Sequence, residues 1–142
     1  EELTLEIPAL GIKSKVLGVP VAAGGWDLTW LGSALGWLEG TAFPSTKGNS
    51  TITGHVFNSD GKPGIFNQLE TLKFGDQILL HAFGQTYVYE VRANKLIHPQ
   101  DFSALSDKNG FWLTLLTCKD FDEKSASYLS RVAVSAVLVE IR

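Results

Sequence analysis

Residues 131–141 read RVAVSAVLVEI, and between Val132 and Val139 only Ser135 interrupts the apolar run. A run that is apolar on both faces predicts a strand covered on both sides and central in its sheet. A second extended run, FWLTLLTC at residues 111–118, precedes it. The segment between them, residues 119–130, opens with polar residues and is expected to be a loop that joins two neighbouring strands.

Further short runs rich in β-branched and aromatic residues extend toward the N-terminus, separated by many of the 14 glycines and 5 prolines. They predict strands over residues 3–7, 13–19, 49–57, 77–82, 86–92 and 95–98. Residues 27–38 differ, because their apolar side chains recur at helical spacing and Asp27 is suited to an N-cap; they predict a helix. Helical turns are expected within residues 65–72 and 101–105. The pattern predicts an all-β barrel or sandwich of about eight strands with one or two short helices.

The length of 142 residues suits a single domain, residues 1–142. Hydrophobic residues make up 44% and charged residues 19%, which argues against disorder. The net charge is −3 with no basic stripe, so nucleic acid is not an expected partner. No apolar run has the ~20 residues of a membrane helix. The sequence contains no Met, so we expect a processed or engineered start, with any membrane anchor outside the sequence.

Cys118 is the only cysteine, which excludes an intramolecular disulfide and a cysteine-rich zinc site. Two interpretations remain. A free cysteine is often a small buried hydrophobic residue. Alternatively it is a reactive thiol, and its place at the C-terminal edge of a predicted strand favours display in a loop region.

A nucleophilic cysteine needs a base or a cation to form its thiolate. The candidate bases are His55, His81 and His98, although a histidine taken alone is more often a structural or surface residue than a catalytic one. His55 follows Gly54, where the lack of a side chain would allow another group to approach the backbone.

An oxyanion needs a donor that keeps its charge, as a guanidinium does. Of the three arginines, Arg131 begins the last predicted strand. If residues 119–130 connect neighbouring antiparallel strands, Arg131 returns close to Cys118. The alternative is an ordinary arginine that faces solvent at the start of a strand.

These residues carry a family resemblance. The run TLLTC at residues 114–118 resembles the TLxTC motif of sortases, and ITGH at residues 52–55 resembles the segment that carries their catalytic histidine. Arg131 matches the position of the catalytic arginine of that family. The resemblance covers nearly the whole chain, from the pair Ile7-Pro8 to the last strand. It implies a closed or nearly closed β-barrel of about eight strands with one or two short helices.

The resemblance implies a cysteine transpeptidase that cleaves a C-terminal LPxTG-like sorting signal between Thr and Gly. Cys118 would form a thioacyl intermediate, His55 would move protons and Arg131 would hold the substrate backbone or the oxyanion. Thr117 would help to position the substrate. Ile65 and Phe66, which follow a turn near His55, are candidates for lining the groove and fit a packing role equally well.

The partners so implied are surface proteins with a sorting signal and an amine acceptor of the cell envelope. The enzyme would be a monomer at the extracellular face of a bacterial membrane, anchored by a segment outside the sequence. A short acidic cluster (Asp120, Asp122, Glu123) follows Cys118, but calcium needs six to eight oxygen ligands. Glu39 stands nearly alone before His55, so we expect no required metal and no cofactor.

Two other functions stay open from the residues. A cysteine peptidase on a similar barrel would hydrolyse the signal without transfer. A catalytically inactive β-barrel binding module would bury Cys118 as an inert thiol.

Overall fold

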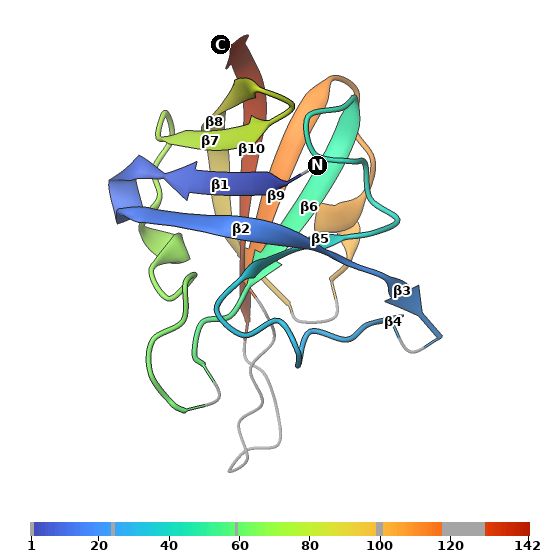
Figure 1. Ribbon diagram of the computed structural model, residues 1–142, viewed down its shortest axis with the longest axis vertical. Coiled ribbons are helices and arrows are strands. Elements are labelled where there is room, and N and C mark those ends of the chain that lie inside the picture. The colour runs from blue at the N-terminus through green and yellow to red at the C-terminus, as the bar shows by residue number, and fades with distance from the viewer. Residues whose placement is uncertain (1, 24, 59, 99–100, 118–129) are drawn as a thin grey trace.

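The computed structural model describes residues 2–23, 25–58, 60–98, 101–117 and 130–142. In this part of the chain, neighbouring strands close into one barrel (Figure 1). In order around the barrel they are β1 (Leu3–Ile7), β2 (Ile12–Val19), β5 (Leu35–Leu38), β6 (Gly48–Gly54), β9 (Phe111–Thr117), β10 (Arg131–Ile141), β8 (Gln85–Ile97) and β7 (Gln77–Ala82), which pairs again with β1. This confirms the predicted all-β barrel of about eight strands.

The smaller elements lie outside the barrel wall. They are a two-stranded sheet of β3 (Val21–Ala22) and β4 (Gly25–Trp26), and three short 3-10 helices, η1 (Pro8–Leu10), η2 (Leu69–Thr71) and η3 (Ser103–Leu105). Helices η2 and η3 fall inside the two segments predicted to contain helical turns. The predicted strands over residues 3–7, 77–82 and 131–141 have the observed bounds.

The core fills the barrel with side chains from alternate positions of its strands. On β10, Val134 and Ala136 are fully buried in this core, together with Leu113 and Leu115 of β9. Ser135, between the two β10 residues, faces the outside of the barrel and is half-buried. Strand β10 pairs with both β8 and β9, as every strand of the closed barrel pairs with two neighbours, so no strand of this sheet is more central than another.

One parallel and one antiparallel pairing decide which strand ends meet. Strand β6 runs parallel to β9, with the register running from Gly48 opposite Phe111 to Gly54 opposite Thr117. Strand β10 is antiparallel to β9, so it begins where β9 ends. The C-terminal ends of β6 and β9 and the start of β10 therefore lie together at one end of the barrel (Figure 1).

The helix predicted over residues 27–38 is wrong. Asp27 starts a turn instead, because its Oδ1 accepts hydrogen bonds from Thr29 N and Thr29 Oγ1 at 3.0 and 2.6 Å. The last four residues, Leu35–Leu38, form β5, parallel to β2 and antiparallel to β6. The apolar residues Leu31, Ala34 and Leu38 pack on Val19 in a small cluster. Strand and turn thus bury most of the apolar residues that suggested a helix, whereas Trp30 is exposed.

Strand β8 runs without interruption through residues that the sequence pattern predicts as two strands, 86–92 and 95–98, with a break at residues 93 and 94. Directly before this break, at Arg92, the register with β10 shifts, because Ala93 lies opposite Ser135 and Val91 lies opposite Ala136. A bulge keeps one strand continuous while it disturbs the alternation of side chains. Asn94 next to it donates to the carbonyl oxygens of Leu69 and Leu72, which ties η2 to the barrel.

Candidate active site

Thr117, the last residue of β9, links this strand to the start of β10. Its hydroxyl is buried and accepts a hydrogen bond from Val132 N at 2.9 Å. Its carbonyl oxygen accepts a second one from Nε of Arg131, also at 2.9 Å. The Arg131 side chain is half-buried and therefore held along the end of β9. The Thr117 hydroxyl has a structural partner, and its role toward a substrate stays a prediction.

His55 follows the last residue of β6 and is held from both its ring and its backbone. Its Nε2 lies 3.0 Å from the carbonyl oxygen of Leu28. A carbonyl oxygen only accepts, so Nε2 carries the proton in this contact and Nδ1 is the ring nitrogen left to exchange protons. The His55 carbonyl oxygen accepts a hydrogen bond from Phe66 N at 3.0 Å.

The backbone around His55 is packed so closely that two neighbouring positions require glycine. A Cβ on Gly64 would lie 2.3 Å from the His55 carbonyl oxygen. A Cβ on Gly54 would lie 2.7 Å from a methyl carbon of Leu35 and 3.0 Å from Phe66. The expectation that Gly54 permits a close approach is therefore confirmed, and the approaching groups are core side chains.

The Leu28 carbonyl that faces His55 belongs to the turn begun by Asp27. The two hydrogen bonds from Thr29 to the Asp27 carboxylate enclose Leu28. These bonds lower the pKa of the exposed Asp27 carboxyl, which keeps it ionised as an acceptor. The turn that replaced the predicted helix thus supplies a contact to the candidate base.

The strand pairing brings these elements to one place. Gly54 and Thr117 form the last register pair between β6 and β9, and they directly precede His55 and Cys118 in the chain. Arg131 contacts Thr117 from the neighbouring strand. Cys118 itself lies outside the described residues, as do Asp120, Asp122 and Glu123 of the acidic cluster.

The two candidate groove residues, Ile65 and Phe66, lie next to the backbone of His55, which Phe66 N contacts. Phe66 is fully buried in the core, and Ile65 is half-buried and packs against it. Phe66 therefore offers packing and a backbone donor rather than exposed surface. The substrate-binding role predicted for Ile65 and Phe66 stays a prediction.

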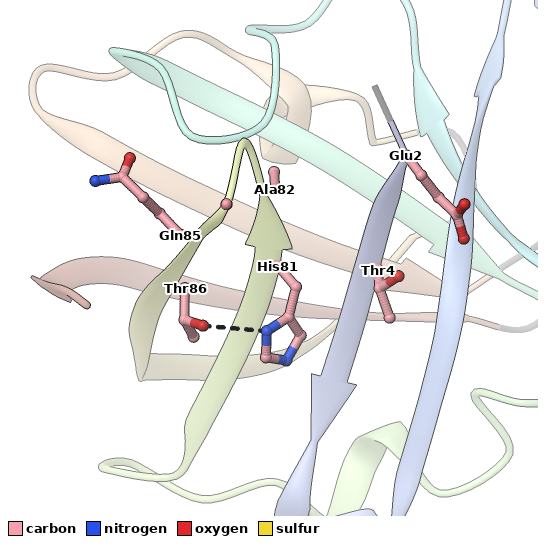
Figure 2. Close-up of a pocket in the computed structure, with 7 residues that line it drawn as sticks. Glu2, Thr4, His81, Ala82, Gln85 and Thr86 are labelled. Carbon is pink, nitrogen blue, oxygen red and sulfur yellow. Dashed lines mark hydrogen bonds between the residues drawn. The ribbon is translucent and has the colours of Figure 1, made fainter.

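His81 lies on β7, whereas His98 directly follows Ile97, which pairs with Arg131, so His98 lies at the same end of the barrel as Arg131. His81 of β7 bridges two strands, with Nδ1 3.1 Å from Thr86 Oγ1 and Nε2 3.0 Å from Glu6 Oε1. Figure 2 shows this ring beside an open pocket of about 370 Å³ near the β7–β8 turn. His98 follows the end of β8. Across the described ranges, no three His, Cys, Asp or Glu side chains are grouped to hold a metal ion.

Sequence reasoning missed a second feature near Arg131. A cavity of about 310 Å³ opens on the outer face of the barrel between η3 and the strands β8, β9 and β10. Lys108, Thr114 and Ser135 contribute to its wall, and Lys108 Nζ lies 3.1 Å from Ser135 Oγ. The break that Ser135 makes in an otherwise apolar strand was the signal in the sequence.

Asn49 of β6 fixes the segment that forms the outer wall of this cavity. Its side chain is buried and donates to the carbonyl oxygens of Ala104 and Ser106 at 2.8 and 2.9 Å. Its Oδ1 accepts from Thr114 Oγ1 at 2.7 Å. All the hydrogen-bonding atoms of this amide except one lone pair are thus used to attach η3 to the barrel.

Known proteins are similar to this chain over most of its length. A family model described as "Sortase domain" matches residues 5–139. YwpE of Bacillus subtilis (strain 168), whose name assigns it to the sortases, is 30% identical over 94 residues, which are 66% of this chain and 86% of that protein. Sortase A from Corynebacterium diphtheriae has a TM-score of 0.77 at 29% identity, over 98% of this chain and 60% of the other. A sortase E mutant from Streptomyces avermitilis shares the fold, with a TM-score of 0.79 at 23% identity, over 99% and 88%.

Proposed function

This chain belongs to the sortase family, and on that premise we propose that it is a cysteine transpeptidase acting on a C-terminal sorting signal of the LPxTG kind. It would cleave the signal between Thr and Gly and transfer the new acyl group to an amine of the cell envelope. The proposed catalytic residues are Cys118, His55 and Arg131. The hydrogen bond from Arg131 Nε to the Thr117 carbonyl is the main support, because it fixes a guanidinium one residue before Cys118.

In the proposed first half-reaction, the Cys118 sulfur attacks the threonine carbonyl carbon and a tetrahedral intermediate forms. The bond between that carbon and the glycine nitrogen breaks, while protonated His55 gives its proton to the leaving amine. A thioester on Cys118 remains. The contact between Nε2 and Leu28 O supports Nδ1 as the nitrogen that transfers the proton.

In the second half-reaction an amine attacks the thioester carbon. His55 takes a proton from this amine, the carbon–sulfur bond breaks, and an amide and the free thiolate result. Arg131 would stabilise the negative oxygen in both tetrahedral intermediates, because a guanidinium stays charged at physiological pH. Its anchor on Thr117 limits the reorganisation needed when the charge develops.

The proposed partners are surface proteins that carry a sorting signal and an amine acceptor of the cell envelope. The proposed location is the extracellular face of a bacterial membrane, with a monomeric enzyme anchored by a segment outside this sequence. Within the part of the chain that the structure describes, no helix is long and apolar enough to span a bilayer.

Intact-mass spectrometry tests the proposal directly. The chain is incubated with a library of peptides of the sorting-signal kind, with and without a glycine-based amine. We expect an acyl adduct on Cys118 that disappears when amine is added, with formation of the transfer product. Cys118→Ala should abolish both adduct and product. His55→Ala and Arg131→Ala should each reduce the rate at least ~10²-fold.

Two results would contradict the proposal. If the adduct decays only to the free acid at any amine concentration, the chain is a peptidase. If no adduct forms and a mild thiol reagent at neutral pH leaves Cys118 unmodified, the thiol is inert and the binding-module alternative holds.

A further inference from the structure

The cavity beside Arg131 carries more positive than negative charge. Lys95 of β8 and Lys108 both contribute to its lining, together with hydroxyl groups that include Ser103 and Ser135. Asp101 contributes the one carboxylate among the lining residues. Its Oδ1 accepts from Ser103 N and Ser103 Oγ at 2.9 and 2.6 Å, so the carboxylate is engaged at the start of η3.

Among the side chains that the structure describes, Lys108 is held in the cavity without a carboxylate partner. Its Nζ contacts Ser135 Oγ at 3.1 Å and lies 5.0 Å from the centre of the Trp112 ring. Among the described residues, the ion pairs join other side chains and include neither Lys108 nor Lys95. Partial burial, together with the nearby charge of Lys95, lowers the pKa of Lys108. An ammonium group has three donors, and the serine uses one of them.

The cavity is also preformed. Asn49 holds η3 against the barrel through the carbonyl oxygens of Ala104 and Ser106. Asp107, the residue before Lys108, accepts a hydrogen bond from Asn49 N at 3.1 Å. The wall that carries Lys108 is therefore attached on both sides of Ser106, and little ordering is needed when a ligand binds.

The position of the cavity relates it to the proposed scissile bond. Ile97, which pairs with Arg131 across β8 and β10, lines the cavity, as do Ala133 and Ser135 on the same face of β10 as Arg131. Four residues along a strand separate Arg131 from Ser135, a distance of about 13 Å. An extended peptide alongside β10, with its cleaved carbonyl at Arg131, spans this distance in about four residues.

We propose that Lys108, assisted by Lys95, makes this enzyme select sorting signals with an acidic side chain at the fifth residue before the cleaved bond, directly before the LPxTG-like motif. This inference rests on the proposed function, with the residues before the cleaved bond running along β10 from Arg131 toward Ser135. The carboxylate would accept hydrogen bonds from Lys108 Nζ and from the cavity hydroxyls. A charge-assisted hydrogen bond in a partly desolvated site is worth about tenfold or more in affinity.

Binding of matched peptides tests this selection without turnover. The Cys118→Ala chain is titrated with fluorescent peptides of the sorting-signal kind that carry either Glu or Gln at one of the second to sixth positions before the Thr–Gly bond. We expect the Glu peptide to bind about tenfold more tightly than its Gln partner at the fifth position. At the other positions, and at about 1 M salt, the ratio should fall below about twofold.

Substitutions then identify the residue responsible. Lys108→Gln should reduce the ratio below about twofold, and Lys95→Gln should reduce it partly. Lys13→Gln removes the same charge from the exposed surface of β2 and should leave the ratio unchanged. If Lys108→Gln fails to fold, the Lys95→Gln variant and the salt series decide.

The outcomes separate this inference from the proposed function. A Glu/Gln ratio within twofold at every position, no detectable binding, or a preference that survives Lys108→Gln or high salt overturns the selection by Lys108. Adduct formation on unmodified Cys118, followed separately by mass, decides the transpeptidase proposal. Adducts without an acidic preference would leave the function in place and overturn only the selection.

Discussion

Arg131 Nε donates to the carbonyl oxygen of Thr117 at 2.9 Å, so the first side chain of β10 is fixed to the last peptide unit of β9. The contact uses the planar geometry of the guanidinium, in which Nε and the terminal nitrogens point in set directions. Lysine carries its three donors on a single nitrogen, so an ammonium held at the Thr117 carbonyl cannot also place donors where the terminal nitrogens of the guanidinium lie.

Arg131→Lys should therefore reduce kcat/KM for a sorting-signal peptide at least ~10²-fold, although the charge is kept. The rate of thioacyl formation measures this loss. Arg92→Lys is the matched control, because Arg92 lies on β8 and pairs with Glu90. A rate within threefold of the unmodified chain would remove Arg131 from the mechanism.

The Asp27 turn positions His55 indirectly, through the Leu28 carbonyl. Asp27→Ala removes both hydrogen bonds that shape the turn and should lower kcat about tenfold with a change in the pH–rate profile, because the His55 proton loses its fixed acceptor. Asp27→Asn keeps the Oδ1 acceptor and should retain most of the rate.

Steady-state kinetics across pH 5 to 9 measure both variants, with Tm recorded alongside. A fall in Tm with an unaltered pH profile would show that the turn serves stability alone. An Asn variant as slow as the Ala variant would point to the charge of Asp27 instead of its acceptor geometry.

Asn49 contributes to stability through its buried amide. Asn49→Ala leaves the carbonyl oxygen of Ser106 without its donor, removes the closer of the two donors to Ala104 O and removes the closer acceptor of Thr114 Oγ1. Unsatisfied buried groups cost about 1–3 kcal/mol each, so we expect the free energy of unfolding to fall by about 3 kcal/mol. Urea denaturation measures this loss. Asn109→Ala, in an exposed turn, is the control and should change stability by less than about 0.5 kcal/mol.

Most strands could be located in the sequence because runs of apolar and β-branched residues are typical of a barrel wall. Residues 3–7, which alternate, and residues 131–141, which are almost continuously apolar, have the observed bounds, whereas β5 was not predicted as a strand and β8 was predicted as two. The pattern failed at residues 27–38, where helical spacing came from a turn and a short strand that share one apolar cluster. Periodicity cannot tell a helix from such a combination when the run is short.

The site was predictable in part. Residue types and motif spacing indicated His55 and Arg131, and the structure holds both at one end of β6, β9 and β10. Two contacts could not be predicted: the one between His55 and the Leu28 carbonyl, and the hydrogen bonds from Asn49 to the segment around η3. Each depends on which backbone carbonyl faces the side chain, and the path of the chain decides this, not the residue type. Lys108 was missed because a single lysine in a loop has no distinctive pattern.

Tyr89 gives the barrel a stability that depends on pH in the alkaline range. Burial in the core raises its pKa from 10.0 to about 12. Between these values the unfolded chain releases the phenol proton while the folded chain keeps it, so the free energy of unfolding falls as pH rises. The stabilisation is fully present well below pH 10. Between pH 9 and pH 11 the free energy of unfolding falls by about 1.3 kcal/mol through this residue. Urea unfolding at both pH values measures it, and Tyr89→Phe, which cannot ionise, should lose less by that amount. Equal losses in the two chains would mean that the Tyr89 phenol ionises as readily in the folded barrel as in the unfolded chain.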